Sequence, residues 1–393
     1  MSSDPIVIVA ARRTPLGAFQ GALSGASAPD LGAAAIRGAI DASRIDAADV
    51  DQVLMGCVLP AGLGQAPARQ AAITAGIPVG TACTTVNKMC GSAMMTIMLG
   101  HDMLKAESAS VIVAGGLESM SNAPYLLPKA RRGYRMGHQE VLDHMFYDGL
   151  QDPWQGQMMG HYADDTAEKY GFSADDQNAF AIESVTRAQA AVANGTFADE
   201  ISPVTIKSRK GEITIDTDET PGVVSIEKIP TLRPAFKKDG TVTAATSSSI
   251  SDGAAATVLM TAAEAERRGL EPMARLVGHS SFAQEPAWFT TAPVAAIGKL
   301  HQSLGWSPDD VDLYEINEAF AVVTMAAMHD VGLDHSKVNV NGGACALGHP
   351  IGATGARITT TLLHALKTRN LKRGIASLCI GGGEAVAIGV ELI

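Results

Sequence analysis

Short apolar segments alternate along this chain with longer segments of mixed polarity. The apolar runs of strand length are Ile6–Ala10, Val111–Ala114 and Ala376–Ile380. Continuous apolar runs of this length are typical of strands that are buried on both faces of a parallel sheet. The segments of helical length with mixed apolar faces include Asp30–Ala42, Ala93–Lys105 and Ala356–Lys367. Strands that alternate with helices in this way predict an α/β fold.

The two ends of the chain also resemble each other. Ile45–Leu54 aligns with Trp306–Glu315 at an offset of 261 residues, and Val111–Gly116 aligns with Ser377–Gly382 at an offset of 266. Nearly equal offsets indicate one duplicated α/β unit, with chance similarity between common strand–turn patterns as the alternative. If the copies pack about a pseudo-twofold axis, side chains from opposite halves meet at the interface, where ligand sites often form.

The stretch between the repeats, from about Ser119 to Ala245, contains polar loops and most of the basic clusters. It includes two helical segments, Gln157–Tyr170 and Ala174–Asn194. Ser173 has the character of an N-cap, with acidic residues in the first turn that follows. We interpret this stretch as an insertion. The predicted domains are residues 1–120 with 246–271 (N-terminal half), 121–245 (inserted loop domain) and 272–393 (C-terminal half).

Composition limits the possible partners. The 393 residues are 46% apolar and 18% charged, which predicts two or three well-buried domains. A net charge of −11 argues against general binding to nucleic acid or to an anionic membrane, because both require basic surfaces. Local basic loops could still hold an anionic small molecule.

The five cysteines are scattered and odd in number, so they predict no disulfide framework. The sequence also has no C-x-x-C pair or Cys/His ligand cluster, so we predict no metal site. Reduced cysteines fit a reducing compartment. The N-terminal residues lack the features of a signal peptide, and no apolar run is long enough to span a bilayer. Together these features predict a cytoplasmic protein.

Cys90 is the first candidate for chemistry. It is followed by Gly91-Ser92 and an apolar segment of helical length, which places it at a predicted helix N-terminus. The free amides and dipole of a helix N-terminus favour a thiolate, so we expect a lowered pKa. The alternative is that Cys90 is a small buried hydrophobic residue.

His349 and Cys379 lie in glycine-rich turns. His349 belongs to Asn341–Gly355, which we expect to be a shaped loop rather than a regular element; a solvated surface histidine is the alternative. Cys379 lies near the end of an apolar run, just before Gly381–Gly383. This turn favours exposure of the sulfur at the strand end, where α/β sheets place their sites. The alternative is that Cys379 belongs to the core of the strand.

Asn317 follows Val311–Ile316, another segment with the character of a buried strand, and is either a turn residue or a group that orients a water or an oxyanion. Cys345 shares the loop of His349 but has no polar partner near it in the sequence, so we treat it as structural. Two thiols and an imidazole on glycine-rich turns suggest acyl transfer, with one sulfur as nucleophile and the other as base.

These segments resemble the thiolase family over essentially the whole length of the chain. The resemblance rests on five collinear blocks: Asn87–Ser92, Gly115–Ser121, Asn317–Phe320, Asn341–Gly355 and Cys379–Gly383. It implies a thiolase-like five-layered fold made of two duplicated α/β halves, with a loop domain inserted in the first half. It also implies reversible condensation of two acetyl-CoA molecules to acetoacetyl-CoA and CoA. The coenzyme A thioesters are then substrates, and no cofactor is required.

The resemblance assigns separate roles to the reactive residues. Cys90 is the acylated nucleophile and His349 takes its proton. Cys379 deprotonates the methyl group of the second acetyl-CoA. Asn317 holds a water that, with His349, stabilises the enolate oxygen, and the backbone N–H groups of Cys90 and Gly381 form another oxyanion hole. The family positions that contact coenzyme A match Leu150, Met159, Phe236, Ala244, Ser248, Ala319 and Phe320.

Other features concern phosphate binding and assembly. The basic clusters that could hold the phosphates are Lys129–Arg132, Lys207–Lys210 and Lys237–Lys238. Arg131–Gly137 resembles a loop that makes tetramer contacts in the family, so we expect a homo-oligomer, either a dimer or a tetramer. Four features depart from the family pattern: Met158, Thr246, Glu384 and a segment, Asp218–Pro230, that lacks an arginine found in some members.

Three other functions would make different demands on these residues. A 3-ketoacyl-CoA thiolase of broader chain length would use identical chemistry with a larger acyl pocket. A decarboxylating ketoacyl synthase would normally use Cys-His-His or Cys-His-Asn, so Cys379 counts against it. An inactive acyl-CoA-binding or lipid-carrier relative would be expected to lack a reactive residue, whereas Cys90, His349, Cys379 and Asn317 are all present.

Overall fold

A computed structural model describes residues 4–208 and 211–393 of the chain. Its main strands form one continuous sheet in the order β12-β13-β14-β11-β1-β10-β5-β3-β4. The N-terminal half contributes β1 (Ile6–Arg13), β3 (Gln52–Gly56), β4 (Ala82–Val86), β5 (Val111–Ser119) and β10 (Ser251–Thr261), with β2 (Gly17–Ala18) beside β10. The C-terminal half contributes β11 (Ala274–Ala283), β12 (Leu313–Ile316), β13 (Arg373–Ile380) and β14 (Glu384–Leu392).

The sheet topology confirms the predicted duplication. In the N-terminal half β3 is parallel to β5, and the ladders β5–β10 and β10–β1 are antiparallel. In the C-terminal half β12 is parallel to β13, and the ladders β13–β14 and β14–β11 repeat the antiparallel pattern. Only two residue pairs join β1 to β11, so the two half-sheets meet along a short seam.

One detail of the predicted repeat was wrong. The alignment of Ile45–Leu54 with Trp306–Glu315 makes Gln52 equivalent to Leu313. Gln52 pairs with Ile112, and Leu313 pairs with Gly374. The sheet therefore matches Ile112 with Gly374, four residues away from the alignment predicted from the shared Gly-Gly pairs. Those glycines belong to different structural contexts, a strand interior in one half and a hairpin turn in the other.

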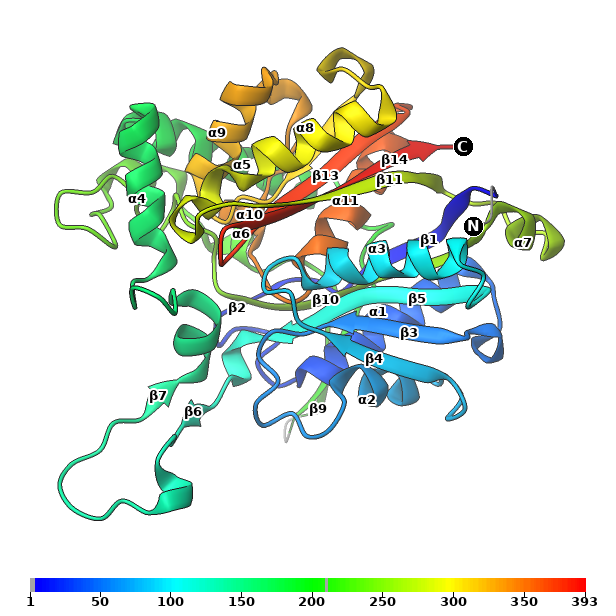
Figure 1. Ribbon diagram of the computed structural model, residues 1–393, viewed down its shortest axis with the longest axis horizontal. Helices are drawn as coiled ribbons and strands as arrows, with labels where there is room; N and C mark the ends of the chain where they lie inside the picture. Colours follow the sequence, from blue (N-terminus) through cyan, green and yellow to red (C-terminus); the bar gives the residue numbers. More distant parts are fainter. Residues whose placement is uncertain (1–3, 209–210) are drawn as a thin grey trace.

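Helices and half-sheets form five layers (Figure 1). The outer helices α1 (Ala28–Ser43) and α2 (Pro67–Thr74) pack on one half-sheet, and α8 (Ala292–Leu304) packs on the other. Between the half-sheets lie α3 (Ser92–Lys105) and α11 (Thr354–Thr368), which contact each other and strands of both halves. Since α11 has a sheet on either side, nearly all of its residues are buried, unlike those of an amphipathic surface helix.

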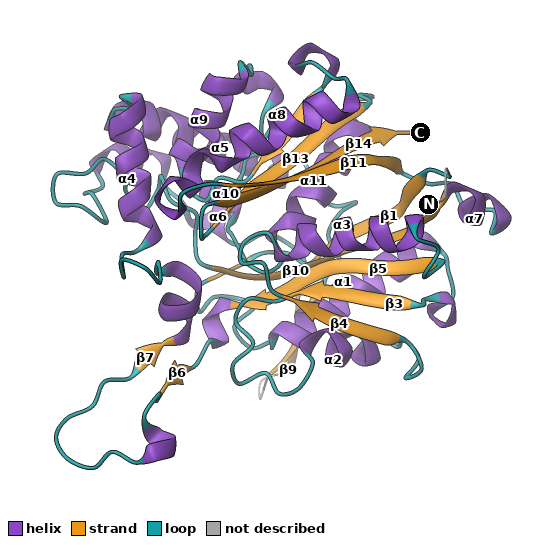
Figure 2. Cartoon of the chain, in the orientation of Figure 1, coloured by secondary structure: helices purple, strands orange, loops and turns teal. Residues whose placement is uncertain are grey.

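Helices of the inserted segment lie beside the C-terminal half (Figure 2). The main helices of this insertion are α4 (Met159–Tyr170) and α5 (Ala174–Ala193), close to the predicted ranges. Ser173 and Asp176 form a capping box at the start of α5, which confirms the predicted N-cap. Its small elements are β6 (Tyr125–Leu126), β7 (Leu142–Asp143), β8 (Val204–Ser208), β9 (Gly211–Ile215) and α6 (Thr220–Val223).

Three further helices lie outside the insertion: α7 (Ala262–Arg267), α9 (Ala321–Val331) and α10 (Ala344–Leu347). The single turn α10 interrupts Asn341–Gly355, which the sequence predicted to be entirely loop. No helix within residues 4–208 and 211–393 combines the length and apolar character that a membrane crossing needs.

Candidate active site

Cys90 lies in a tight turn between β4 and α3, directly before the N-cap Gly91. Asn87 Oδ1 accepts a hydrogen bond from the N–H of Met89 at 2.9 Å, and Ser92 Oγ donates to the Met89 carbonyl at 2.6 Å. Met89 has a φ of +47°, which a residue with a side chain rarely adopts. These local bonds hold the backbone in a strained form that presents the cysteine at the end of the strand.

The expected lowering of the Cys90 pKa was wrong. Burial raises the pKa of Cys90 to about 11, although the backbone N–H groups of Gly381 and Cys90 act on the sulfur in the lowering direction. Desolvation of the thiolate therefore outweighs the amides at the helix N-terminus. Those two N–H groups are the pair predicted for the oxyanion hole, and both favour the charged form of the sulfur.

Cys379 comes from the other half of the molecule. It lies near the end of β13, and its side chain is completely buried in an apolar cluster with residues such as Ala319 and Phe320. The predicted exposure of its sulfur was wrong, because the insertion and α9 cover this strand end. Burial is the main cause that raises the pKa of Cys379, and the charge of Cys90 adds to it. The effect of the Cys90 charge on Cys379 places the two sulfurs within electrostatic range of each other.

The turn after Cys379 requires glycine. Gly382 and Gly383 have φ values of +95° and +90°. A Cβ on Gly383 would lie 2.4 Å from the Gln284 carbonyl oxygen, so this close backbone approach excludes any side chain. The turn thereby sets the course of the backbone at Gly381, whose N–H acts to lower the pKa of Cys90.

His349 is buried and lies between α10 and α11. Its Nδ1 lies 2.6 Å from Thr354 Oγ1, whose hydroxyl donates to the Pro350 carbonyl at 2.9 Å. Because the Thr354 hydroxyl already donates its hydrogen to Pro350, it can only accept a hydrogen bond from His349. Nδ1 of His349 is therefore the donor, and Nε2 carries the free lone pair. Nε2 has no hydrogen-bond partner within the described part of the chain. Burial lowers the pKa of His349 to about 3, so the imidazole is neutral.

Asn317 directly follows β12 and is almost fully buried. Its backbone N–H donates to the Ser377 carbonyl at 3.0 Å, which ties it to β13. Neither polar atom of its side chain has a partner among residues 4–208 and 211–393. Buried amides are normally hydrogen-bonded, so this one is suited to hold a water or a polar atom of a substrate.

Two carboxylates that sequence reasoning missed hold these loops in place. Glu118, at the end of β5, accepts backbone N–H bonds from Val58 and Leu59 of its own half and from Gly352 of the His349 loop, at 2.8–3.1 Å. Burial raises the pKa of Glu118 to about 7. On the other side, Glu318 accepts from the Cys345 N–H at 3.0 Å. No local sequence signal shows that these carboxylates accept hydrogen bonds from the loops of the site, because their partners lie far away along the chain.

Cys345 itself lies in an apolar cluster with Phe180, Ala321 and Met325, as expected for a structural cysteine. Thr354 belongs with the carboxylates as a positioning residue that sequence reasoning missed. Its spacing of five residues from His349, across a proline, was the one available signal.

A mainly apolar cavity of about 260 Å³ leads to His349. Five of the predicted coenzyme A contacts line it: Leu150, Met159, Phe236, Ser248 and Phe320. Ala319 lies behind the wall, with its carbonyl accepting from the Ser248 N–H at 3.0 Å, and Ala244 is exposed and not part of the lining. The lining residues that the sequence did not identify as contacts include Met120, Phe146, Ile250 and Ile351.

The residues that depart from the family pattern have defined positions. Met158 lines the cavity beside Met159. Thr246 is buried and bonded to Thr243, and Glu384 forms an ion pair with Lys88 next to the Cys90 turn. Asp218 forms an ion pair with Arg13 of the N-terminal half.

Among the basic residues, Lys237 pairs with Asp165. Lys129–Arg132 is exposed. Part of the predicted cluster Lys207–Lys210, residues 209 and 210, lies outside the described residues. The position of the coenzyme A phosphates therefore stays a prediction.

Comparison with known proteins finds matches along nearly the whole chain. Residues 6–263 match the family model "Thiolase, N-terminal domain", and residues 270–392 match "Thiolase, C-terminal domain". The acetyl-CoA acetyltransferase of Pseudomonas aeruginosa is 50% identical over 385 residues, which cover 98% of each chain. That of Rhizobium meliloti is 46% identical over 392 residues and covers 100% of each.

Solved structures agree as well. The Bacillus anthracis acetyl-CoA acetyltransferase superposes with a TM-score of 0.97 at 41% identity, covering 99% of both chains. The Acat5 thiolase from Ascaris suum, in complex with coenzyme A, has a TM-score of 0.94 at 40% identity and covers 99% of this chain and 100% of its own. With both family domains matched and full-length relatives near 50% identity, the chain belongs to the thiolase family.

Proposed function

We propose that this protein is an acetyl-CoA C-acetyltransferase, which condenses two acetyl-CoA molecules reversibly to acetoacetyl-CoA and CoA. The observation that carries the proposal is that two thiols from opposite halves of the fold, Cys90 and Cys379, lie within electrostatic range of each other, and that the Gly381 N–H favours the charged form of the first sulfur. Two thiols suit this reaction because the acyl group occupies one sulfur, so a second group must move the Cα proton.

In the first half-reaction, Cys90 Sγ attacks the thioester carbonyl and its proton passes to Nε2 of His349. The N–H groups of Cys90 and Gly381 stabilise the tetrahedral oxyanion; losing one such donor typically costs about 10²–10³ in rate. As the carbon–sulfur bond of the substrate breaks, the departing CoA takes the proton of Cys379. This leaves acetyl-Cys90, a protonated His349 and a Cys379 thiolate.

In the second half-reaction, the Cys379 thiolate removes a proton from the methyl group of the second acetyl-CoA. Protonated His349, with a water held by Asn317, stabilises the enolate oxygen. The enolate carbon attacks acetyl-Cys90 to form the new carbon–carbon bond. The expelled Cys90 sulfur then takes the proton from His349, and every group returns to its initial state. This cycle needs no resident cofactor, because its protons and acyl group move between these side chains and the thioesters.

Acetyl specificity is favoured over a broader-chain 3-ketoacyl-CoA thiolase, because the full-length relatives compared above are acetyl-CoA acetyltransferases. We assign the binding of the coenzyme A part of the substrate to the apolar cavity that ends at His349. Its lining suits the pantetheine arm of coenzyme A, with the phosphates outside near the basic residues of the insertion.

We also propose a homo-oligomer, either a dimer or a tetramer, in a reducing cytoplasmic compartment. An arm that contains β6 and β7 extends away from the layers (Figure 1), and it exposes apolar side chains, including Met136 at 91%. Exposed apolar side chains on a projecting arm support burial against another copy of the chain. A reducing compartment is supported by a mechanism that requires two free thiols.

The test is thiolysis by CoA of acetoacetyl-CoA and of a C8–C16 3-ketoacyl-CoA, compared by kcat/KM. We expect acetoacetyl-CoA to be the better substrate by at least tenfold. Equal or better cleavage of the long-chain substrate would contradict acetyl specificity while leaving the chemistry intact. Failure with both substrates would contradict the thiolase activity itself.

A further inference from the structure

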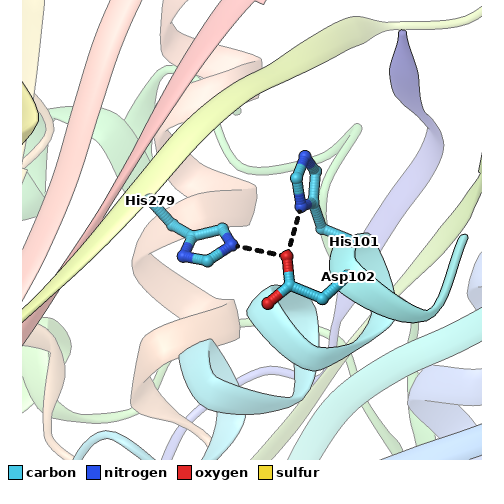
Figure 3. A group of neighbouring side chains, drawn as sticks. All are labelled: His101, Asp102 and His279. Atoms are coloured by element: carbon cyan, nitrogen blue, oxygen red, sulfur yellow. Dashed lines mark hydrogen bonds and ion pairs between the residues drawn. The ribbon is translucent and has the colours of Figure 1, made fainter. Parts of the chain in front are cut away.

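A cluster of metal-ligand side chains lies away from the reactive thiols. His101 and Asp102 occupy the last turns of α3, and His279 lies on β11 of the C-terminal half (Figure 3). Nδ1 of His101 lies 2.9 Å from Asp102 Oδ1, and Nε2 of His279 lies 3.0 Å from the same oxygen. The three ligand atoms lie within 4.8 Å of one another.

We propose that His101, Asp102 and His279 form a binding site for a divalent transition metal of the Zn²⁺ or Co²⁺ type. Two imidazole nitrogens and one carboxylate oxygen suit such borderline ions, whereas Mg²⁺ and Ca²⁺ prefer oxygen ligands alone. Three protein ligands leave the remaining coordination positions to water.

The spacing of the ligand atoms supports this assignment. Bonds of about 2.0–2.1 Å to the metal place neighbouring ligand atoms about 2.8–3.4 Å apart, from octahedral to tetrahedral geometry. The distances of 2.9 and 3.0 Å at Asp102 therefore need to open by only a few tenths of an ångström, if at all. A metal takes the place of the bridging hydrogens without net loss of protons, because each neutral imidazole can carry its N–H on its other nitrogen.

The burial of the ligands favours a defined site. The side chains of His101 and His279 are 14% and 21% exposed, while that of Asp102 is 59% exposed. The two rings are thus held by the protein, with centroids 5.1 Å apart, and the carboxylate side faces solvent. The sequence predicted no metal site because Asp102 and His279 are 177 residues apart, so no ligand spacing is visible along the chain.

The position of the site suggests a structural role, separate from the reaction. It joins the helix that follows Cys90 to a strand of the opposite half, in the same sheet that carries Cys379. A metal there would stabilise the packing of the two halves by binding the folded state alone.

The test is titration of the full-length protein with Co²⁺, monitored by visible absorption, and with Zn²⁺, monitored by calorimetry. Both are done in a Cys90→Ala background, so that the reactive thiol cannot bind the metal. We expect one saturable site per chain and a rise in the melting temperature with metal. His279→Gln should weaken binding by at least the 10- to 100-fold that even second-shell changes cost at metal sites.

The matched control is His329→Gln. His329 and Asp330 form the same adjacent pair at 2.8 Å near the end of α9, but the pair belongs to no three-ligand group among the described residues. This variant should bind metal as the parent does. Absence of saturable binding, binding unchanged by His279→Gln and by Asp102→Asn, or equal loss in the His329 variant would each overturn the proposal. A thiolate charge-transfer band in the Co²⁺ spectrum would also overturn it.

Discussion

At the scale of single residues, the free protein holds its reactive pair uncharged. Burial places the pKa of Cys90 near 11 and that of His349 near 3, so thiol and neutral imidazole coexist across the physiological range. The nucleophile is therefore activated only when a substrate is bound, when proton transfer to His349 accompanies attack. The Nδ1 bond to Thr354 matters for this step because it leaves the Nε2 lone pair as the acceptor.

This charge state predicts the pH dependence of Cys90 alkylation. Only the thiolate reacts with iodoacetamide, and the thiolate fraction grows as the pH rises toward the raised pKa of the thiol. We expect the rate without substrate to increase roughly tenfold per pH unit between about pH 6 and pH 9. Mass spectrometry of the peptide that contains Cys90 measures it, with Cys83 outside the site as the reference. A plateau below about pH 8 would instead indicate a thiolate–imidazolium pair.

At the scale of the elements, the site depends on loops from opposite halves that touch through their backbones. The nucleophile turn follows β4, the hairpin turn follows β13, and the His349 loop precedes α11. Gly352 of that last loop packs directly against Glu118, Cys57 and Val58. Its N–H donates to Glu118, so this contact sets the position of the His349 loop relative to the N-terminal half.

Gly352→Ala tests this contact. The new Cβ would lie 2.4 Å from Glu118 Oε2 and 3.0 Å from the Cys57 backbone, so the loop must move. We expect a loss of about 1–3 kcal/mol in the free energy of unfolding, together with a large drop in kcat.

The matched control is Gly298→Ala in α8, where a Cβ meets no atom within 4 Å. That change should leave kcat unaltered and raise stability by about 0.4–1 kcal/mol. Chemical denaturation and steady-state kinetics measure both variants. If Gly352→Ala behaved like the control, the close approach would have no role in positioning His349.

The elements also show what the sequence could reveal. Strand–helix alternation and the internal repeat predicted the fold, since buried strands and caps leave local signals such as Ser173 before α5. Turn glycines marked the segments of Cys90, His349 and Cys379. The positioning roles of Glu118 and Thr354 were missed because each depends on hydrogen-bond partners that only the folded structure brings together. The predictions of a lowered pKa for Cys90 and of an exposed sulfur for Cys379 were wrong. Both depend on how deeply the side chains are buried, and that is set by the insertion and by the opposite half of the fold.

At the scale of the whole molecule, the insertion is anchored to the N-terminal half by a buried ion cluster. Arg13 of β1 binds Glu200 at 2.6 Å and Asp218 at 2.7 and 2.8 Å, and all three side chains are almost completely buried. Asp218 also accepts the Leu16 N–H at 2.8 Å. The insertion supplies part of the substrate cavity, so this cluster links the stability of the fold to the shape of the site.

Arg13→Met should therefore destabilise the protein strongly. It keeps much of the apolar volume but leaves two buried carboxylates without their partner, which typically costs about 3–5 kcal/mol. Arg267→Ala, at an ion pair with Glu264 on the surface of α7, is the control and should change stability little. Equilibrium unfolding in denaturant measures both. Similar stabilities for the two variants would show that the buried cluster does not anchor the insertion.

The central claim is that thiols from the two halves divide the reaction between them, and acetyl transfer to the Cys379→Ser variant tests it most directly. After incubation with acetyl-CoA, mass spectrometry should find an acetyl group on the peptide that contains Cys90, while condensation to acetoacetyl-CoA falls by several orders of magnitude. Accumulation of the acetyl-enzyme without product would agree with separate roles. An unacetylated Cys90, or condensation at the parent rate, would contradict the account.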